Sequence, residues 1–323
     1  MKAAIQTGFG NPSDVLRVGD IATPSIDDDG VLVRVRAASI HIGAVYGVRG
    51  FPKVMRPMFK SYIADGGIIG QNLAGVVEAV GTNVTQREVG DEVFGSAKGA
   101  FAEYAATTPD ALAPKPANLT FEQASAVGVS AFTALQAIRD HGKVSDGQHV
   151  LITGASGGVG TFAVQFAKSL GAEVTGVCST RNLDLVRSIG ADHVIDYTQA
   201  DFTAGEPEYD LILDNVGAHS LKDMRRVLAP EGLLLANGAP APTGWFGGLG
   251  HPLKVALSSM VNGQQGRPFL STENEEDLAT LHDLAEAGTI TPVIDQVFPF
   301  ESAVEAVASV GEGHNQGTTV IAM

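Results

Sequence analysis

The chain has 323 residues, 44% of them hydrophobic, and its 36 acidic against 21 basic side chains give a formal net charge of -15. This length predicts two domains, because a single hydrophobic core seldom organises so many residues. The acidic balance argues against nucleic acid and anionic membrane surfaces as partners, since both repel a negatively charged protein.

Cysteine content limits the chemistry that the chain can carry. Cys178 is the only cysteine, so neither an intramolecular disulfide nor a cluster of thiolate ligands for zinc can form within the chain. No apolar run is long enough to span a bilayer, and Met1–Ile5 leads into a strand-like pattern without the apolar segment of a signal peptide. We therefore expect a cytoplasmic protein that makes no membrane contact.

The first hundred residues predict a compact β domain or barrel. Hydrophobic and polar residues alternate over residues 31–36 as in a half-buried strand, and Pro and Gly residues separate this segment from the next ones. Further strands are predicted at Gly75–Val80 and Phe101–Ala105. The tail predicts helices near Glu275–Glu286 and Glu301–Val310 and strands near Val293–Phe298 and Thr318–Ala322.

A change of pattern at Pro114–Pro116 marks the start of an α/β region. Thr120 and Gln123 fit a capping box, which predicts a helix that continues to about Ile138. Strands and helices then alternate at short spacing, and this pattern predicts a parallel, doubly wound sheet. The expected strands are Val150–Thr153, Glu173–Val177, His193–Asp196, Tyr209–Asp214 and Gly232–Asn237, and Gly171 and Gly190 are expected to end helices.

The fold class is therefore α/β with two domains. We expect one domain at residues 1–118, completed by residues 272–323, and a nucleotide-binding domain at residues 119–271. Residues 240–270 fit no element clearly, and no role is predicted for residues 240–265.

The expected strand at Val150–Thr153 is followed by a glycine-rich turn and the start of a helix, Gly154-Ala155-Ser156-Gly157-Gly158-Val159-Gly160. Small residues let the backbone approach a pyrophosphate, and a helix N-terminus offers N–H groups and the positive end of its dipole. Ala155 replaces the first glycine of the usual fingerprint. The preceding strand and the further βα units nevertheless favour a dinucleotide site over a purely structural turn.

The residues that follow the turn indicate which dinucleotide binds. A site for NAD usually places Asp or Glu about twenty residues beyond the turn. Here the chain has Ser179 and Arg181, with no acidic residue from Val174 to Arg181. A hydroxyl and a guanidinium suit a 2′-phosphate, so the sequence predicts NADPH. The alternative is that Arg181 is a solvated residue at the start of the next helix.

The side chains that bind catalytic zinc are missing from the pattern. The eight histidines are scattered, and Cys178 lies beside the expected adenosine site, far along the chain from the β domain. We therefore expect no metal, and a substrate that accepts hydride without a Lewis acid: a quinone, or an alkene conjugated to a carbonyl.

Four segments carry a resemblance to a known family: residues 74–81, 89–95, 154–160 and 190–197. They resemble the zinc-independent quinone oxidoreductases of the zeta-crystallin type, within the medium-chain dehydrogenase/reductase superfamily, and the resemblance extends over nearly the whole chain. It implies a GroES-like β-barrel catalytic domain, a Rossmann domain, NADPH, and a quinone or enone substrate in a cleft between the domains. It also implies a homodimer, paired through an edge strand near Gly266–Leu270.

The resemblance implies roles for individual residues. Tyr46 matches the active-site tyrosine, which would donate a hydrogen bond or proton to a developing enolate oxygen. The alternatives are a water relay in its place, or a packed aromatic without a catalytic role. The resemblance places Thr133, Asn215-Val216-Gly217 and Asn237-Gly238 near the nicotinamide, and Ser179, Arg181 and Tyr197 near the 2′-phosphate.

The chain departs from the family at two places on the expected substrate side. His41-Ile42-Gly43-Ala44 replaces Asn-Pro-x-Asp, and Gly70-Gln71-Asn72 stands where zinc enzymes carry Gly-His-Glu. His41 is a candidate proton or hydrogen-bond donor, or a histidine that holds a loop. Gln71 and Asn72 are candidates for orienting a substrate carbonyl, or they satisfy local backbone groups. These departures keep open an alternative function, an NADPH-binding redox sensor or structural protein with little turnover.

Overall fold

The computed structural model describes residues 1–57, 63, 66–205, 208–238, 255 and 265–323. These residues form two compact units, Met1–Phe132 with Glu273–Met323 (unit 1) and Thr133–Thr272 (unit 2). The division falls at Phe132, later than the end of the first domain at residue 118 that we expected. Most of the ambiguous segment 240–270 lies outside the described residues.

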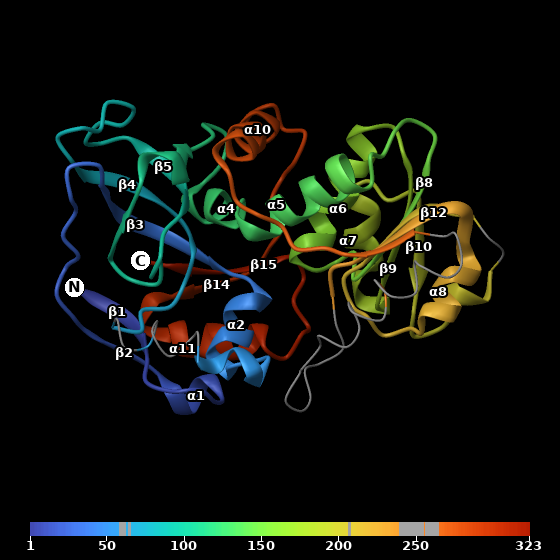
Figure 1. The fold of residues 1–323 in the computed structure, drawn as a ribbon, viewed down its shortest axis with the longest axis horizontal. Coiled ribbons are helices and arrows are strands. Elements are labelled where there is room, and N and C mark those ends of the chain that lie inside the picture. Colours follow the sequence, from blue (N-terminus) through green and yellow to red (C-terminus); the bar gives the residue numbers. More distant parts are fainter. Residues whose placement is uncertain (58–62, 64–65, 206–207, 239–254, 256–264) are drawn as a thin grey trace. The chain divides into compact units, whose positions relative to one another are not determined.

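The tail of the chain supplies strands to the main sheet of unit 1 (Figure 1). Strand β15 (Thr318–Ala322) lies between β14 (Ile294–Pro299) and β3 (Val31–Ile40), and it pairs with β3 in antiparallel register. The described sheet has the order β14-β15-β3-β4-β5-β7, with β6 on β3, and a separate antiparallel pair is formed by β1 and β2. The remaining strands are β1 (Lys2–Gln6), β2 (Leu16–Asp20), β4 (Asn72–Val80), β5 (Glu92–Ser96), β6 (Tyr104–Thr107) and β7 (Leu112–Pro114).

A hydrophobic core fills unit 1. Its buried side chains come from alternate residues of β3, from β4 and from α11 (Ala303–Val310), as their apolar faces predict. The strand expected at Phe101–Ala105 begins only at Tyr104, because Phe101 is buried in the core and Ala102 makes an isolated bridge to Ala3. The other described helices of unit 1 are α1 (Pro12–Val15), α2 (Ile42–Arg49), η1 (Lys53–Met55), η2 (Pro109–Ala111), α4 (Phe121–Ala126), α10 (Glu275–Glu286) and η7 (Phe300–Ser302).

The prediction of one continuous helix from Thr120 to about Ile138 is wrong, because the structure has three helical segments there. The first of them begins with the expected capping box, in which the Gln123 N–H donates to the Thr120 hydroxyl over 3.2 Å. The chain then forms α4, α5 (Val129–Leu135) and the π-helix η3 (Gln136–His141). The break at Gly128 has a physical cause: the Asn72 side chain packs against this residue, where a Cβ would lie 2.4 Å from the Asn72 amide carbon.

Unit 2 contains the doubly wound sheet that the alternating pattern predicts. All of its described strands are parallel, in the order β10-β9-β8-β11-β12-β13. They are β8 (His149–Thr153), β9 (Glu173–Cys178), β10 (His193–Asp196), β11 (Tyr209–Asp214), β12 (Leu228–Ala236) and β13 (Gln265–Pro268). The described helices of this unit that follow η3 are α6 (Gly158–Ser169), η4 (Thr180–Asn182), α7 (Leu183–Ser188), η5 (Phe202–Ala204) and α8 (Leu221–Val227).

The strand order of unit 2 reverses between β8 and β11. From β8 the chain continues outwards through β9 and β10, and it then crosses to β11 on the other side of β8 (Figure 1). At such a reversal the connections leave the carboxyl ends of two neighbouring strands in opposite directions. Ligands of doubly wound sheets bind in the crevice that this leaves.

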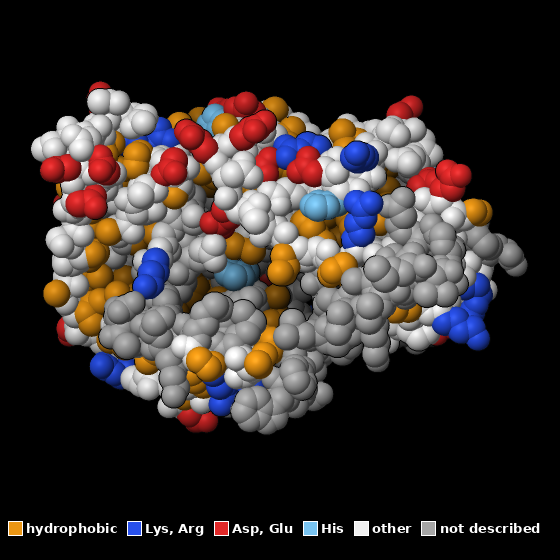
Figure 2. Space-filling view, viewed as in Figure 1, with side chains coloured by type: hydrophobic (Ala, Val, Ile, Leu, Met, Phe, Trp, Pro, Cys, Tyr) orange, Lys and Arg blue, Asp and Glu red, His pale blue; other side chains and the backbone are white. Residues whose placement is uncertain are grey.

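The surface of the described residues reflects the net charge of the chain. Acidic side chains are spread over the upper part of the face in Figure 2, and the Lys and Arg side chains on its described part form no continuous patch. Within the described residues, no helix has the length and hydropathy that crossing a membrane requires.

Candidate functional site

The glycine-rich turn lies at the carboxyl end of β8, on the strand-order reversal. Gly154 has a φ of 62°, a left-handed conformation that favours glycine, and Gly157 is the N-cap of α6. A Cβ at Gly160 would lie 2.1 Å from the Gly154 carbonyl oxygen, so only glycine lets α6 start this close to the turn. The first N–H groups of α6 have no partner within the helix, and together with the helix dipole they suit a pyrophosphate.

The residues expected to meet the 2′-phosphate come together at the ends of β9 and β10. Ser179 follows β9, Arg181 lies exposed in η4, and Tyr197, which is 59% exposed, follows β10. The Tyr197 N–H donates to the Cys178 carbonyl over 3.1 Å, which joins the two strand ends. Cys178 itself is buried, and burial raises the pKa of its thiol to about 11. Its side chain is therefore a small buried thiol that stays protonated.

Asp196 is a residue near these strand ends that the sequence analysis missed. It ends β10, beside β9, and its Oδ2 accepts a hydrogen bond from the Thr180 hydroxyl over 2.6 Å. Its Oδ1 accepts bonds from the backbone and hydroxyl of Thr198. The bond from Thr180 does most to hold the pKa of Asp196 below its usual value, and the Thr198 bonds add to this effect. The search for an acidic residue along β9 alone did not reach it, because Asp196 comes from the neighbouring strand.

The two loops expected to line the nicotinamide follow β11 and β12 and contact each other. The Asn237 amide donates to the Asn215 Oδ1 over 2.7 Å, and a Cβ at Gly238 would lie 2.1 Å from the Asn215 carbonyl oxygen. The close approach of the two backbones therefore requires glycine at 238. Thr133 is buried on α5, and its hydroxyl lies 2.7 Å from that of Ser271.

Buried Asp214, which sequence reasoning also missed, holds the first of these loops. Its Oδ1 accepts hydrogen bonds from the Thr153 hydroxyl over 2.8 Å and from the N–H groups of Val216 and Gly217. Asn215 in turn donates to the Thr153 hydroxyl and to its carbonyl. An acidic residue directly after the apolar run Leu211–Leu213 of β11 was the available signal for this role.

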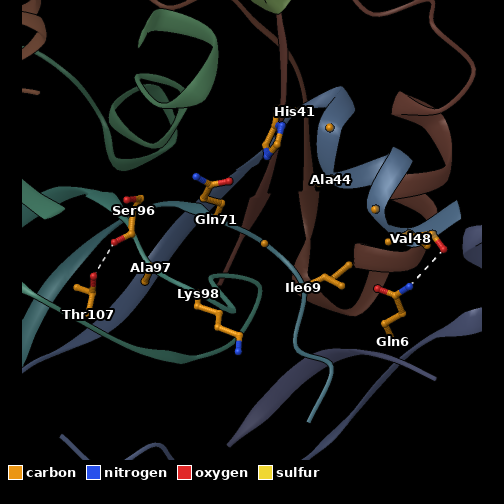
Figure 3. Close-up of a pocket in the computed structure, with 13 residues that line it drawn as sticks. Gln6, His41, Ala44, Val48, Ile69, Gln71, Ser96, Ala97, Lys98 and Thr107 are labelled. Carbon is orange, nitrogen blue, oxygen red and sulfur yellow. Dashed lines mark hydrogen bonds between the residues drawn. The ribbon is translucent and has the colours of Figure 1, made fainter. Parts of the chain in front are cut away.

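Unit 1 contains a cavity of about 470 Å³, which Figure 3 shows in close-up. It is lined by α2, by the segment before β4, by the end of β5 with the residues that follow it, and by the last residues of β1 and β6. His41 and Gln71 face one another at one end (Figure 3). The lining residues are Gln6, His41, Gly43, Ala44, Gly47, Val48, Ile69, Gly70, Gln71, Ser96, Ala97, Lys98 and Thr107.

His41 is the N-cap of α2, and its imidazole folds back over the first turn. A Cβ at Gly43 would lie 2.8 Å from the His41 Nδ1, so glycine makes room for the ring. Burial lowers the pKa of His41 to about 4, and a hydrogen bond to the Gln71 side chain opposes this shift only in part. The imidazole is therefore neutral at physiological pH.

The structure does not bring every expected substrate residue to this cavity. Tyr46 lies on α2 but is not among the residues that line the cavity, and burial raises the pKa of its phenol. Asn72 is buried, donates to the Ser39 hydroxyl over 3.1 Å and accepts from the Val129 N–H. Asn72 thus joins β4 to β3 and to the start of α5, and it does not line the cavity.

Comparisons with known proteins agree with both units. Residues 27–117 match the family model described as an alcohol dehydrogenase GroES-like domain, and residues 189–321 match one described as a zinc-binding dehydrogenase. The chain is 30% identical to a quinone oxidoreductase of Sus scrofa, over 96% of this chain and 93% of the relative. It is also 30% identical to an NADPH-dependent alkenal/one oxidoreductase, chloroplastic, of Arabidopsis thaliana, over 99% of this chain and 79% of the relative.

A solved structure supports the same assignment. The quinone oxidoreductase from Coxiella burnetii superposes with a TM-score of 0.87 and 28% identity, and the match covers 100% of this chain and 99% of that one. The GroES-like unit, the Rossmann unit and these relatives define an oxidoreductase. The chain belongs to the quinone oxidoreductases of the medium-chain dehydrogenase/reductase superfamily.

The described residues do not fit the zinc that one family description names. Catalytic zinc takes three protein ligands, mostly Cys, His or carboxylates. The lining of the unit 1 cavity offers one imidazole, that of His41, together with amides, hydroxyls and Lys98. In the part of the chain that the structure describes, there is no group of three or more His, Cys, Asp or Glu side chains that could hold a metal ion.

We predict that His41 titrates far below the ordinary value for histidine. Its pKa of about 4 lies under the ordinary value of 6.5, so the folded state favours the neutral imidazole. This contribution to stability is complete above about pH 6.5 and is lost as the pH falls towards 4. An NMR titration of the eight imidazoles should show one that stays neutral until the pH approaches 4, and this signal should vanish in His41→Gln.

The variant Gln71→Leu provides the matched control for this titration. Because the hydrogen bond to Gln71 favours the charged imidazole, its removal should lower the pKa of His41 further. A wild-type spectrum in which all eight imidazoles titrate near 6.5 contradicts the prediction.

Proposed function

We propose that this protein is a zinc-independent reductase that uses NADPH to reduce a quinone or an α,β-unsaturated carbonyl compound. The observation that carries the proposal is the neutral His41–Gln71 pair at one end of a largely apolar cavity. Charge that develops on a carbonyl oxygen is stabilised by such hydrogen-bond donors, without a metal. The activities for which the pig and Arabidopsis relatives are named support the same substrate classes.

The pair acts on the substrate oxygen through Gln71. NADPH, when bound, supplies the hydride that adds to the electrophilic carbon of the substrate, and the electron pair displaced moves to the carbonyl oxygen. The imidazole of His41 donates to the amide oxygen of Gln71, which leaves both amide hydrogens of Gln71 to donate to that oxygen. Apolar neighbours such as Val48 and Ile69 exclude water, which strengthens these hydrogen bonds.

A proton must then reach the reduced substrate. We propose Tyr46 as its source, through a water relay, because burial raises the pKa of its phenol and so keeps the proton on the oxygen near neutral pH. Tyr46 does not line the cavity, so in this proposal Tyr46 supplies a proton and Gln71 orients the substrate.

An acceptor screen with paired variants tests the proposed chemistry. Removal of one oxyanion donor typically lowers kcat by roughly a hundredfold, so Gln71→Leu should lower kcat on enones by this order and leave the NADPH dissociation constant unchanged. Tyr46→Phe should lower kcat with a pH dependence that differs from wild type. Equal kcat of Gln71→Leu and wild type on every quinone and enone overturns the role of Gln71.

The same screen tests the alternative function that the altered segment His41–Ala44 favours. Tight NADPH binding by the wild-type protein with no turnover of any acceptor would replace the reductase by a redox sensor or structural protein.

For the cofactor, we propose that NADPH is held by unit 2. The turn from Ala155 to Gly160 holds the pyrophosphate, and Ser179, Arg181 and Tyr197 hold the 2′-phosphate. The nicotinamide is placed against Thr133 and the loops Asn215-Val216-Gly217 and Asn237-Gly238. The fit rests on the free N–H groups of α6 and on the side chains gathered at the ends of β9 and β10.

Substitution of Arg181 tests the phosphate contact. A hydrogen bond to a charged group contributes roughly 1.5–3 kcal/mol, so Arg181→Ala should weaken NADPH binding by about ten- to a hundredfold and NADH binding by much less. Arg187→Ala is the matched control, because this guanidinium lies on α7 beside Asp184 and is not assigned to the cofactor. Equal weakening of both cofactors by Arg181→Ala contradicts the assignment.

We also propose a homodimer formed through β13. This strand is at the edge of the described sheet of unit 2, and Leu270, two residues beyond it, is 88% exposed. Sedimentation should give twice the mass of the chain for wild type and a larger monomer fraction for Leu270→Glu. Val89→Glu, at another exposed apolar residue, is the control. A monomeric wild type overturns the proposal.

A further inference from the structure

A buried asparagine connects the glycine-rich turn to the 2′-phosphate pocket. The Asn182 side-chain nitrogen donates to the Ser156 hydroxyl over 2.8 Å and to the Ser179 hydroxyl over 3.3 Å. Asn182 is only 4% exposed, and Ser156 is buried as well. One amide group therefore binds a side chain in each of the two regions that we assign to phosphates of the cofactor.

Asn182 directly precedes α7, but its side chain does not form the hydrogen bond that would cap this helix. Asn182 is the N-cap of α7, where asparagine is among the preferred residues because its side chain accepts a hydrogen bond from the helix. Here the side chain makes no capping hydrogen bond and turns to the two serines instead. A departure of this kind from local preference is expected at functional sites.

The polarity of these hydrogen bonds has a chemical consequence. An amide nitrogen only donates, so each serine oxygen accepts from Asn182 and keeps its own hydrogen. Within the described residues, neither of these hydroxyls donates to a protein acceptor. Both hydroxyl hydrogens are therefore available to an acceptor from outside the protein, and a phosphate oxygen has acceptor sites only.

We propose that Asn182 is a positioning residue that sets the Ser156 and Ser179 hydroxyls as donors to the pyrophosphate and the 2′-phosphate. Through Ser179 it contributes to the choice of NADPH over NADH, since a hydroxyl that must donate suits a phosphate better than a ribose hydroxyl that also donates. The inference rests on the proposed use of NADPH and names a determinant of it that does not itself touch the cofactor.

A double-mutant cycle tests the inference by the ratio of the NADH to the NADPH dissociation constant. Asn182→Leu removes both donors and should lower this ratio by about fivefold. In a Ser179→Ala background, the same substitution should leave the ratio unchanged, because its effect passes through the missing hydroxyl. A purely structural role of Asn182 would weaken both cofactors equally and would not depend on Ser179.

Two further variants keep the experiment decisive. Asn274→Leu removes a side chain that does cap its helix, α10, and should lower the thermal stability with the cofactor ratio unchanged. If Asn182→Leu does not fold, Asn182→Ser is used instead, with a reduced ratio again expected.

The outcomes separate the inference from the proposed function. A wild-type protein that binds NADPH and NADH equally overturns the proposed cofactor and the inference with it. A wild-type preference for NADPH that the Asn182 variants retain overturns the inference alone. A further fall of the ratio when Asn182→Leu is added to the Ser179→Ala background also overturns it.

Discussion

The hydrogen bond from the Thr153 hydroxyl to the buried Asp214 carboxylate joins the ends of β8 and β11 where the strand order reverses. A buried carboxylate requires donors, and here they come from Thr153 and from the loop that follows β11. The loop is thereby fixed against the strand that carries the glycine-rich turn. Asn215 also accepts a hydrogen bond from the Asn237 side chain, so the ends of β8, β11 and β12 are held in one hydrogen-bonded network. The proposed nicotinamide contacts of unit 2 depend on it.

The α/β pattern of unit 2 was predictable because the spacing of hydrophobic residues and the glycines at helix ends depend on local structure alone. The predicted parallel strands formed, and the capping box at Thr120 is present. The continuous helix to Ile138 did not form, because Asn72 from a distant strand packs at Gly128. The helix propensity of residues 121–138 gives no sign of this contact. In the same way, the sequence places Phe101 in a strand, but in the structure it precedes β6 and its side chain is buried in the core.

The candidate site was predictable where a residue type has a fixed role, as in the turn from Gly154 to Gly160. It was less predictable where the role depends on neighbours from other strands. Asp196 lies beside β9, but it is encoded on β10, so inspection of β9 alone misses it. Asn182 resembles an ordinary helix cap in sequence, and only its hydrogen bonds to Ser156 and Ser179 show another role. Asn72 shows the reverse case, since a polar residue expected near substrate joins β4 to β3 and α5 instead.

The pairing of β15 with one half of β3 has a consequence for synthesis on the ribosome. Residues 37–40 of β3 pair with β15, while residues 31–34 of the same strand pair with β6. The first half of β3 thus finds its neighbours early in translation, and the second half keeps one edge without its partner until Thr318–Ala322 has emerged. Unit 2 is encoded between them and can fold as a continuous segment first. An exposed strand edge invites pairing with other chains, so the nascent protein is most open to aggregation during this interval.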